Sequence, residues 1–142
     1  MIYCDTSLLV ASLTNEAATA KVQRWLGGQL AGTLCVSGWT ITEFSSALSI
    51  KLRSDELTAQ QRASVMTHWR LMLAENLVTI SVPPTAYDLA ARFADRHELK
   101  IRAGAALHLA IASLTGLPLA TLDRVMEQAA LAVGIAVREP GL

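Results

Sequence analysis

The sequence predicts an α/β sandwich in which a central parallel sheet of about five strands carries helices on both faces. Two observations predict it. Short apolar runs of strand length recur along the chain, and longer segments with helical spacing lie between them. No linker, internal repeat or low-complexity tract interrupts this alternation, so residues 1–142 are expected to form a single domain.

The apolar runs and the polar breaks between them define the expected elements. The expected strands are Ile2–Cys4, Thr33–Val36, Val78–Val82, Leu117–Leu122 and Gly134–Val137. Gly27-Gly28 ends the helical segment before the second strand, and the polar Ser54–Leu57 separates the next two helices. The later of these begins with a capping box at Thr58 and runs to about Asn76. Pro84 suits the first turn of the helix that follows the third strand.

Charge and hydropathy limit the partners that the chain can have. Twelve Lys and Arg balance twelve Asp and Glu, so a nucleic acid would have to be held by a local patch. The simplest interpretation of the densest basic cluster is a solvent-exposed helix face. This cluster comprises Arg92, Arg96, Lys100 and Arg102. Polar residues interrupt every apolar run before the ~18 residues that a membrane span needs.

The amino-terminal sequence and the cysteines indicate the compartment. Residues 1–13 lack the positive region and the cleavage site of a secretory signal, so we expect a cytoplasmic protein. Cys4 and Cys35 both fall in apolar, strand-like runs, where a thiol is typically a small buried hydrophobic group. The sequence therefore does not favour a disulfide.

Acidic residues follow three of the expected strands. Asp5 comes directly after the first strand, Asp123 follows the fourth, and Glu43 lies shortly after the second. The carboxyl ends of parallel strands meet at one edge of a sheet, so these side chains can converge there. Converging carboxylates repel one another unless a cation lies among them, and a hard divalent ion such as Mg²⁺ or Mn²⁺ suits oxygen ligands.

Each of these acids also has a purely structural interpretation. Asp5 and Asp123 precede helical segments, where aspartate is a favoured N-cap. Thr40 and Glu43 have the spacing of a capping box, in which the glutamate would accept a hydrogen bond from the backbone N–H of Thr40. The residues alone leave both interpretations open, and the shared location of the three acids beyond strand ends favours the metal site.

The order of these motifs resembles that of the PIN domain and, more narrowly, of the VapC-type toxin ribonucleases of bacterial toxin–antitoxin pairs. The resemblance covers nearly the whole chain. It is carried by Asp5-Thr6-Ser7, Thr42-Glu43-Phe44, Arg102-Ala103-x-x-Ala106-Leu107-His108 and Thr121-Leu122-Asp123. No single piece is specific, but four pieces in this order and at this spacing are.

The resemblance implies an activity, a cofactor and partners. It implies an endoribonuclease that depends on Mg²⁺ or Mn²⁺, cleaves single-stranded or structured RNA, is neutralised by a VapB-like antitoxin and forms a homodimer. It assigns Asp5, Glu43 and Asp123 to the metal site. It also implies a fourth acid, normally an aspartate, directly before Ala106-Leu107-His108. In this chain that position is Ala105.

The missing carboxylate at position 105 changes the expected activity. Mg²⁺ commonly takes only one or two carboxylates directly, so Asp5 with Asp123 or Glu43 can still hold one ion. Loss of a positioned catalytic group typically lowers a rate by about 100-fold or more. We therefore expect an inactive or strongly impaired nuclease. The alternative is a PIN-fold binding module that pairs with an antitoxin and dimerises without cutting RNA.

Polar residues beside the acids can support them. Hydroxyl groups of Thr6, Ser7 and Thr121 can orient the carboxylates through hydrogen bonds, although helix capping is an equal alternative. His108, in an otherwise apolar run, is expected to be a buried helix residue with satisfied hydrogen bonds and not a general base.

A partner is expected to bind between two of the predicted helices. Two segments carry enough apolar side chains to face a partner as well as a core. They are Ala18–Leu26, and Thr40–Ile50 together with Trp39 directly before it. These side chains are Val22, Trp25, Leu26, Trp39, Phe44 and Leu48. The three tryptophans are accordingly expected in a core or an interface, and not stacked on RNA bases.

Overall fold

A parallel sheet of five strands forms the centre of the molecule. The computed structural model describes residues 1–140. The strands are β1 (Ile2–Cys4), β2 (Leu34–Ser37), β3 (Val78–Ile80), β4 (Leu119–Ala120) and β5 (Val137–Arg138). They lie in the order β3-β2-β1-β4-β5, and every adjacent pair is parallel. This confirms the predicted fold class.

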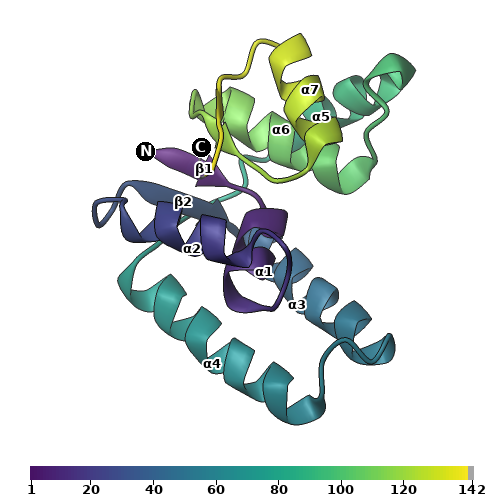
Figure 1. Ribbon diagram of the computed structural model, residues 1–142. Coiled ribbons are helices and arrows are strands. Elements are labelled where there is room, and N and C mark those ends of the chain that lie inside the picture. The colour runs from purple at the N-terminus through teal and green to yellow at the C-terminus, as the bar shows by residue number, and fades with distance from the viewer. Residues whose placement is uncertain (141–142) are drawn as a thin grey trace.

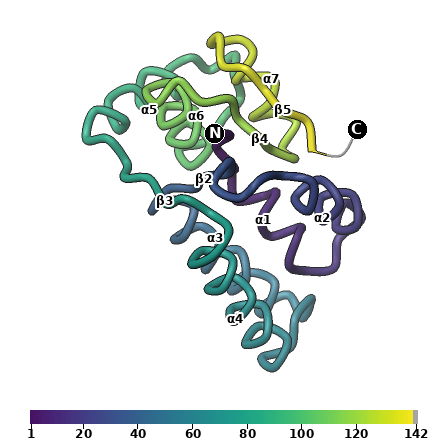
Figure 2. Tube along the Cα trace, turned by 90° about the vertical axis from the view of Figure 1, so that its left-hand side faces the viewer, coloured from purple at the N-terminus to yellow at the C-terminus, as the bar shows by residue number. Residues whose placement is uncertain are grey.

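Helices connect the strands and form the two outer layers. They are α1 (Thr6–Leu13), α2 (Thr19–Gly27), α3 (Gly38–Arg53), α4 (Ala59–Glu75), α5 (Ala86–Asp95), α6 (Ala103–Thr115) and α7 (Arg124–Ala132), with a short 3₁₀ helix at His97–Leu99. Helices α1 to α4 cover one face of the sheet, and α5 to α7 cover the other (Figures 1 and 2).

The strand side chains alternate between two separate cores. Tyr3 and Cys35 pack with the apolar residues of α5, α6 and α7. Their neighbours Cys4 and Val36 pack with those of α1, α3 and α4 on the opposite face. This period of two is the ordinary geometry of a strand that is buried on both sides. The three layers are therefore held together by one hydrophobic core on each side of the sheet.

The connectivity of the sheet places a crevice at the ends of β1 and β4. The chain runs outward from β1 to β2 and β3, and then returns to place β4 on the other side of β1. In open parallel sheets, ligands bind beyond the carboxyl ends of the strands where the strand order reverses. Here the residues that follow these two strand ends are Asp5 and Thr121, and the backbone N–H of Asp5 donates to the carbonyl of Ala120.

Several strand boundaries differ from those predicted. The fourth strand begins at Leu119 and not at Leu117, because Gly116 has a positive φ of 68° and the chain is still turning out of α6. The fifth strand begins at Val137, because Gly134, with φ 81°, forms the turn after α7. The helical predictions were closer. Thr58 caps α4 with both halves of the predicted capping box, whereas Pro84 lies just before α5 and outside its first turn.

The core under α1 to α4 is organised around an aromatic pair. Trp69 of α4 is 1% exposed and stacks on Phe44 of α3, with ring centroids 4.2 Å apart. Because no other side chain can fill the space of an indole, Trp69→Ala is expected to lower the free energy of unfolding by about 3–5 kcal/mol. Urea unfolding followed by circular dichroism measures this. A loss below about 1 kcal/mol would contradict the packing of this core.

The two cysteines are buried and free. Cys4 and Cys35 are both fully inaccessible, and they face opposite cores. Burial raises the pKa of the Cys35 thiol to about 11, so it is present as the unreactive thiol at neutral pH.

No helix among residues 1–140 is both long and apolar enough to cross a membrane.

Candidate active site

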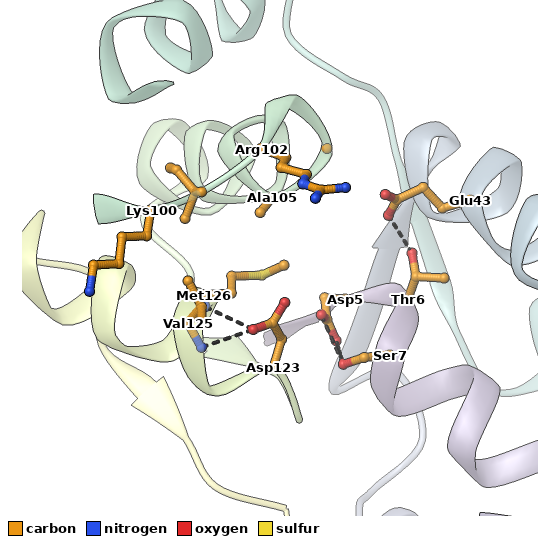
Figure 3. Close-up of a pocket in the computed structure, with 12 residues that line it drawn as sticks. Asp5, Thr6, Ser7, Glu43, Lys100, Arg102, Ala105, Asp123, Val125 and Met126 are labelled. Atoms are coloured by element: carbon orange, nitrogen blue, oxygen red, sulfur yellow. Dashed lines mark hydrogen bonds between the residues drawn. The ribbon is translucent and has the colours of Figure 1, made fainter. Parts of the chain in front are cut away.

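Three acidic side chains meet in one cavity at the carboxyl end of the sheet. The cavity has a volume of about 480 Å³, and Asp5, Glu43 and Asp123 all line it. They come from the ends of β1 and β4 and from α3 (Figure 3). The convergence that the sequence predicts is therefore present. Asp5 and Asp123 are also the N-caps of α1 and α7, so the structural interpretation of these two residues is correct, and it does not conflict with a role in the cavity.

Asp5 is buried at the base of the cavity and is held on all sides. Its side chain is 2% exposed. The Ser7 hydroxyl donates to both carboxylate oxygens, at 2.8 and 3.0 Å, and the Thr121 hydroxyl donates to Oδ2 at 2.8 Å. Burial raises the pKa of Asp5, against the lowering effects of His108 and of these hydrogen bonds. Ser7 and Thr121 thus orient this carboxylate, which is one of the two roles that the sequence left open for them.

Glu43 occupies the second turn of α3, and the capping box that its spacing from Thr40 left open as an alternative is absent. The N-cap of α3 is Ser37, and the reciprocal bonds of the box join Ser37 to Thr40. This alternative is excluded because the helix begins three residues earlier than the Thr40–Glu43 spacing implies. Glu43 is consequently free to project into the cavity, where the Thr6 hydroxyl donates to its Oε1 atom at 2.7 Å.

His108 is the second hydrogen-bond partner of Glu43. Its Nε2 atom lies 2.5 Å from Oε1 of Glu43. Burial by itself would raise the pKa of Glu43, but the hydrogen bond and the charge of His108, together with the bond from Thr6, lower it. His108 is a buried helix residue with satisfied hydrogen bonds, as predicted. The sequence did not reveal that one of these bonds is to a site carboxylate.

Asp123 and Glu43 each keep one oxygen available. Asp123 accepts from the backbone N–H groups of Val125 and Met126 through Oδ1 alone. Within residues 1–140, no hydrogen bond engages Oδ2 of Asp123 or Oε2 of Glu43. The same part of the chain contains no three Asp, Glu, His or Cys side chains close enough to hold one ion directly. The donor set therefore fits a divalent cation that takes one or two carboxylates and keeps much of its water.

Ala105 faces the cavity from the first turn of α6. Its methyl group lies between the start of α6 and the carboxylates of Asp5 and Asp123 (Figure 3). The Arg102 guanidinium group extends from the same turn toward Glu43, whereas the Lys100 ammonium group points away from the acids (Figure 3). An aspartate at position 105 would project its carboxylate into this cavity.

Gly104 allows α6 to approach Glu43 closely. A Cβ atom built on Gly104 would lie 2.7 Å from Oε2 of Glu43, which is closer than a carbon and an oxygen can approach. The carbonyl of Gly104 also accepts a hydrogen bond from Nε1 of Trp39, at 3.3 Å. Sequence reasoning did not single out Gly104, although a glycine directly before Ala105 was a usable signal.

The comparisons with known proteins show the family of this chain. The family model of the PIN domain matches residues 2–131. The chain belongs to the PIN domain family. The match includes Asp5, Glu43 and Asp123, and it also includes Ala105. A comparison by sequence with curated proteins finds no match.

Solved structures share the fold of this PIN domain at low sequence identity. The toxin VapC20 of Mycobacterium tuberculosis, which cleaves the sarcin-ricin loop, is 17% identical, with a TM-score of 0.74 over 99% of this chain and 100% of its own. FitAcB of Neisseria gonorrhoeae is 22% identical, with a TM-score of 0.67 over 99% and 98%. VapBC2 of Rickettsia felis, bound to a DNA fragment from its promoter, is 14% identical, with a TM-score of 0.65 over 98% of each chain. These similarities show the PIN fold.

Proposed function

We propose that this PIN domain is the toxin-type endoribonuclease of a toxin–antitoxin pair, with a centre for Mg²⁺ or Mn²⁺ that Ala105 leaves strongly impaired. The observation that carries the proposal is the convergence of Asp5, Glu43 and Asp123 on one cavity into which Ala105 also faces. The similarity to VapC and VapBC structures supports the toxin–antitoxin setting.

The carboxylates have distinct parts in holding a cation. Oε2 of Glu43 and Oδ2 of Asp123 are the oxygens that would bind it, directly or through water. Asp5, whose oxygens accept bonds from Ser7 and Thr121, would add negative charge below it. When bound, a divalent cation lowers the pKa of an attacking water and offsets the charge on the phosphate.

RNA is the substrate that the surroundings of the cavity suit. Arg102 projects over the cavity, and a guanidinium group can bind a phosphate through two parallel hydrogen bonds. Lys100 lines the same cavity and can contact the next phosphate along the strand. This local pair supplies the positive charge that a chain of zero net charge needs to hold RNA.

The antitoxin and a second copy of the chain complete the proposal. We propose a VapB-like antitoxin, a homodimer and a cytoplasmic setting.

The predicted antitoxin groove needs correction, because Val22, Phe44 and Leu48 are fully buried in the core and cannot contact a partner. A second cavity, between α1 and α3, adjoins the acidic cavity through Thr6, Ser7 and Asp123. It is the better candidate for the antitoxin segment.

The alternative is a PIN-fold binding module that no longer cuts RNA, and Ala105 is the observation that favours it. A cleavage assay at high protein concentration separates the two functions. The purified chain is incubated with end-labelled single-stranded RNA in Mn²⁺, in Mg²⁺ or in EDTA, beside an Asp123→Asn variant. We expect slow cleavage that Mn²⁺ supports and that EDTA and Asp123→Asn abolish. Equal product from the chain and from Asp123→Asn would favour the binding module.

A further inference from the structure

We propose that His108 is a positioning residue that fixes which oxygen of Glu43 faces the cavity. The inference rests on the proposed function, because it concerns the carboxylate that would bind the cation. His108 Nε2 and the Thr6 hydroxyl both bond to Oε1 of Glu43, at 2.5 and 2.7 Å. With Oε1 held from two sides, Oε2 is the only oxygen of Glu43 that can face the cavity.

The imidazole is itself held in one orientation. His108 is 1% exposed, and its Nδ1 atom lies 2.7 Å from the hydroxyl of Tyr3 in β1. The Tyr3 hydroxyl lies 2.9 Å from Oγ of Ser37, at the end of β2. An ionised carboxylate only accepts hydrogen bonds, so Nε2 of His108 must donate to Glu43. Because its Nδ1 atom is fixed by Tyr3, the imidazole presents Nε2 in one direction, toward Glu43.

The network joins the elements whose relative position determines the site. Glu43 lies on α3, whereas His108 lies on α6, three residues after Ala105. The histidine therefore connects α6, which carries Ala105, to α3, which carries Glu43, across the end of the sheet. Gly104 limits Glu43 from the other side, since its backbone approaches Oε2 where no side chain could fit. Glu43 is thus confined between a donor pair and a helix backbone.

Two substitutions at His108 separate the bond to Glu43 from the role in packing. In His108→Gln the amide nitrogen can replace Nε2 and keep the bond to Glu43. In His108→Asn the shorter amide can replace Nδ1 and keep only the bond to Tyr3. Both remove the ring, and Asn leaves the larger cavity, so a packing effect appears as a lower thermal midpoint for His108→Asn, whereas the bond to Glu43 is reported by Mn²⁺ affinity in the folded protein.

Mn²⁺ affinity is the first measurement, made by titration calorimetry in an Ala105→Asp background. We expect His108→Asn to weaken Mn²⁺ binding by about 10- to 100-fold, and His108→Gln to stay within about threefold of the parent. Gly104→Ala is expected to weaken binding similarly, because its methyl group would displace Oε2 of Glu43. Equal affinities in His108→Asn and His108→Gln would overturn the role of His108.

Proton exchange of the imidazole is the second measurement, and it needs no metal. In ¹⁵N-edited NMR of the unsubstituted chain, the Nε2 proton of His108 is expected to exchange slowly, whereas the exposed His97 gives no such signal. Glu43→Gln should shift and weaken the signal. Rapid exchange at His108 would overturn the inference. If the signal is present but the Ala105→Asp parent binds no Mn²⁺, the proposed function fails and the position of Glu43 stands.

Discussion

Ala105→Asp is expected to raise the rate of RNA cleavage by about 100-fold or more in Mg²⁺ or Mn²⁺. This is the factor typically associated with one positioned catalytic group. Residue 105 lines the acidic cavity, so the new carboxylate would join Asp5, Glu43 and Asp123 without displacing a core side chain. Initial rates on an end-labelled single-stranded RNA, resolved on a denaturing gel, measure the effect.

Ala103→Asp is the matched control for this gain. Ala103 lies in the same turn of α6, is exposed, and lines a neighbouring apolar cavity instead of the acidic one. The same substitution there adds the same charge to the same helix end, so it reproduces any general effect on helix stability or RNA repulsion. We expect no gain in cleavage. A similar gain in both variants would show that the carboxylate acts through the helix and not through the site.

Asp5→Asn, made in the Ala105→Asp background, is expected to reduce cleavage by about 100-fold or more. The buried carboxylate would be replaced by a neutral group of the same shape. Burial raises the pKa of Asp5, so the folded protein is destabilised by keeping this group ionised above its folded pKa. Asparagine removes that contribution, but its amide nitrogen cannot accept the hydrogen bonds that one carboxylate oxygen accepts from Ser7 and Thr121. The free energy of unfolding at neutral pH should therefore fall by no more than about 1–3 kcal/mol, the cost of one unsatisfied buried donor, and the protein stays folded.

Activity and stability thus separate at Asp5, and both need to be measured on the same preparations. Asp95→Asn provides the reference, because Asp95 is an exposed acid at the end of α5 and does not line the cavity. It should leave both quantities unchanged. If Asp5→Asn instead unfolds the protein while the remaining folded fraction keeps full activity, Asp5 is a structural cap alone.

The sequence predicts the layers of this fold well because its local signals agree with its overall arrangement. Thr58 shows this, since the residues of its capping box are also those that begin a long helix. Boundaries were less predictable where a glycine turn adjoins an apolar run. Leu117 belongs to the turn after α6, although the apolar run that begins there predicts a strand, because the backbone at Gly116 is still left-handed.

The sequence predicts which acidic residues form the candidate site, but it does not predict the hydrogen bonds that hold them. Asp5 directly follows β1 and Asp123 lies three residues after the last residue of β4, so the topology alone brings them to one edge of the sheet. The bond between Glu43 and His108 spans 65 residues of sequence and depends on how α3 and α6 pack. No local pattern encodes such a contact. The spacing of Thr40 and Glu43 was misleading for the same reason, since Ser37 competes for the cap and is better placed.

Mn²⁺ binding tests most directly whether residue 105 limits this site. Titration calorimetry at neutral pH compares the unsubstituted chain with Ala105→Asp, with Ala103→Asp as the reference. We expect Ala105→Asp to bind one Mn²⁺ at least about 10-fold more tightly than either of the others, because a fourth carboxylate adds an oxygen ligand and a negative charge. Equal affinity in all three proteins would contradict the conclusion that Ala105 leaves a divalent-cation site incomplete.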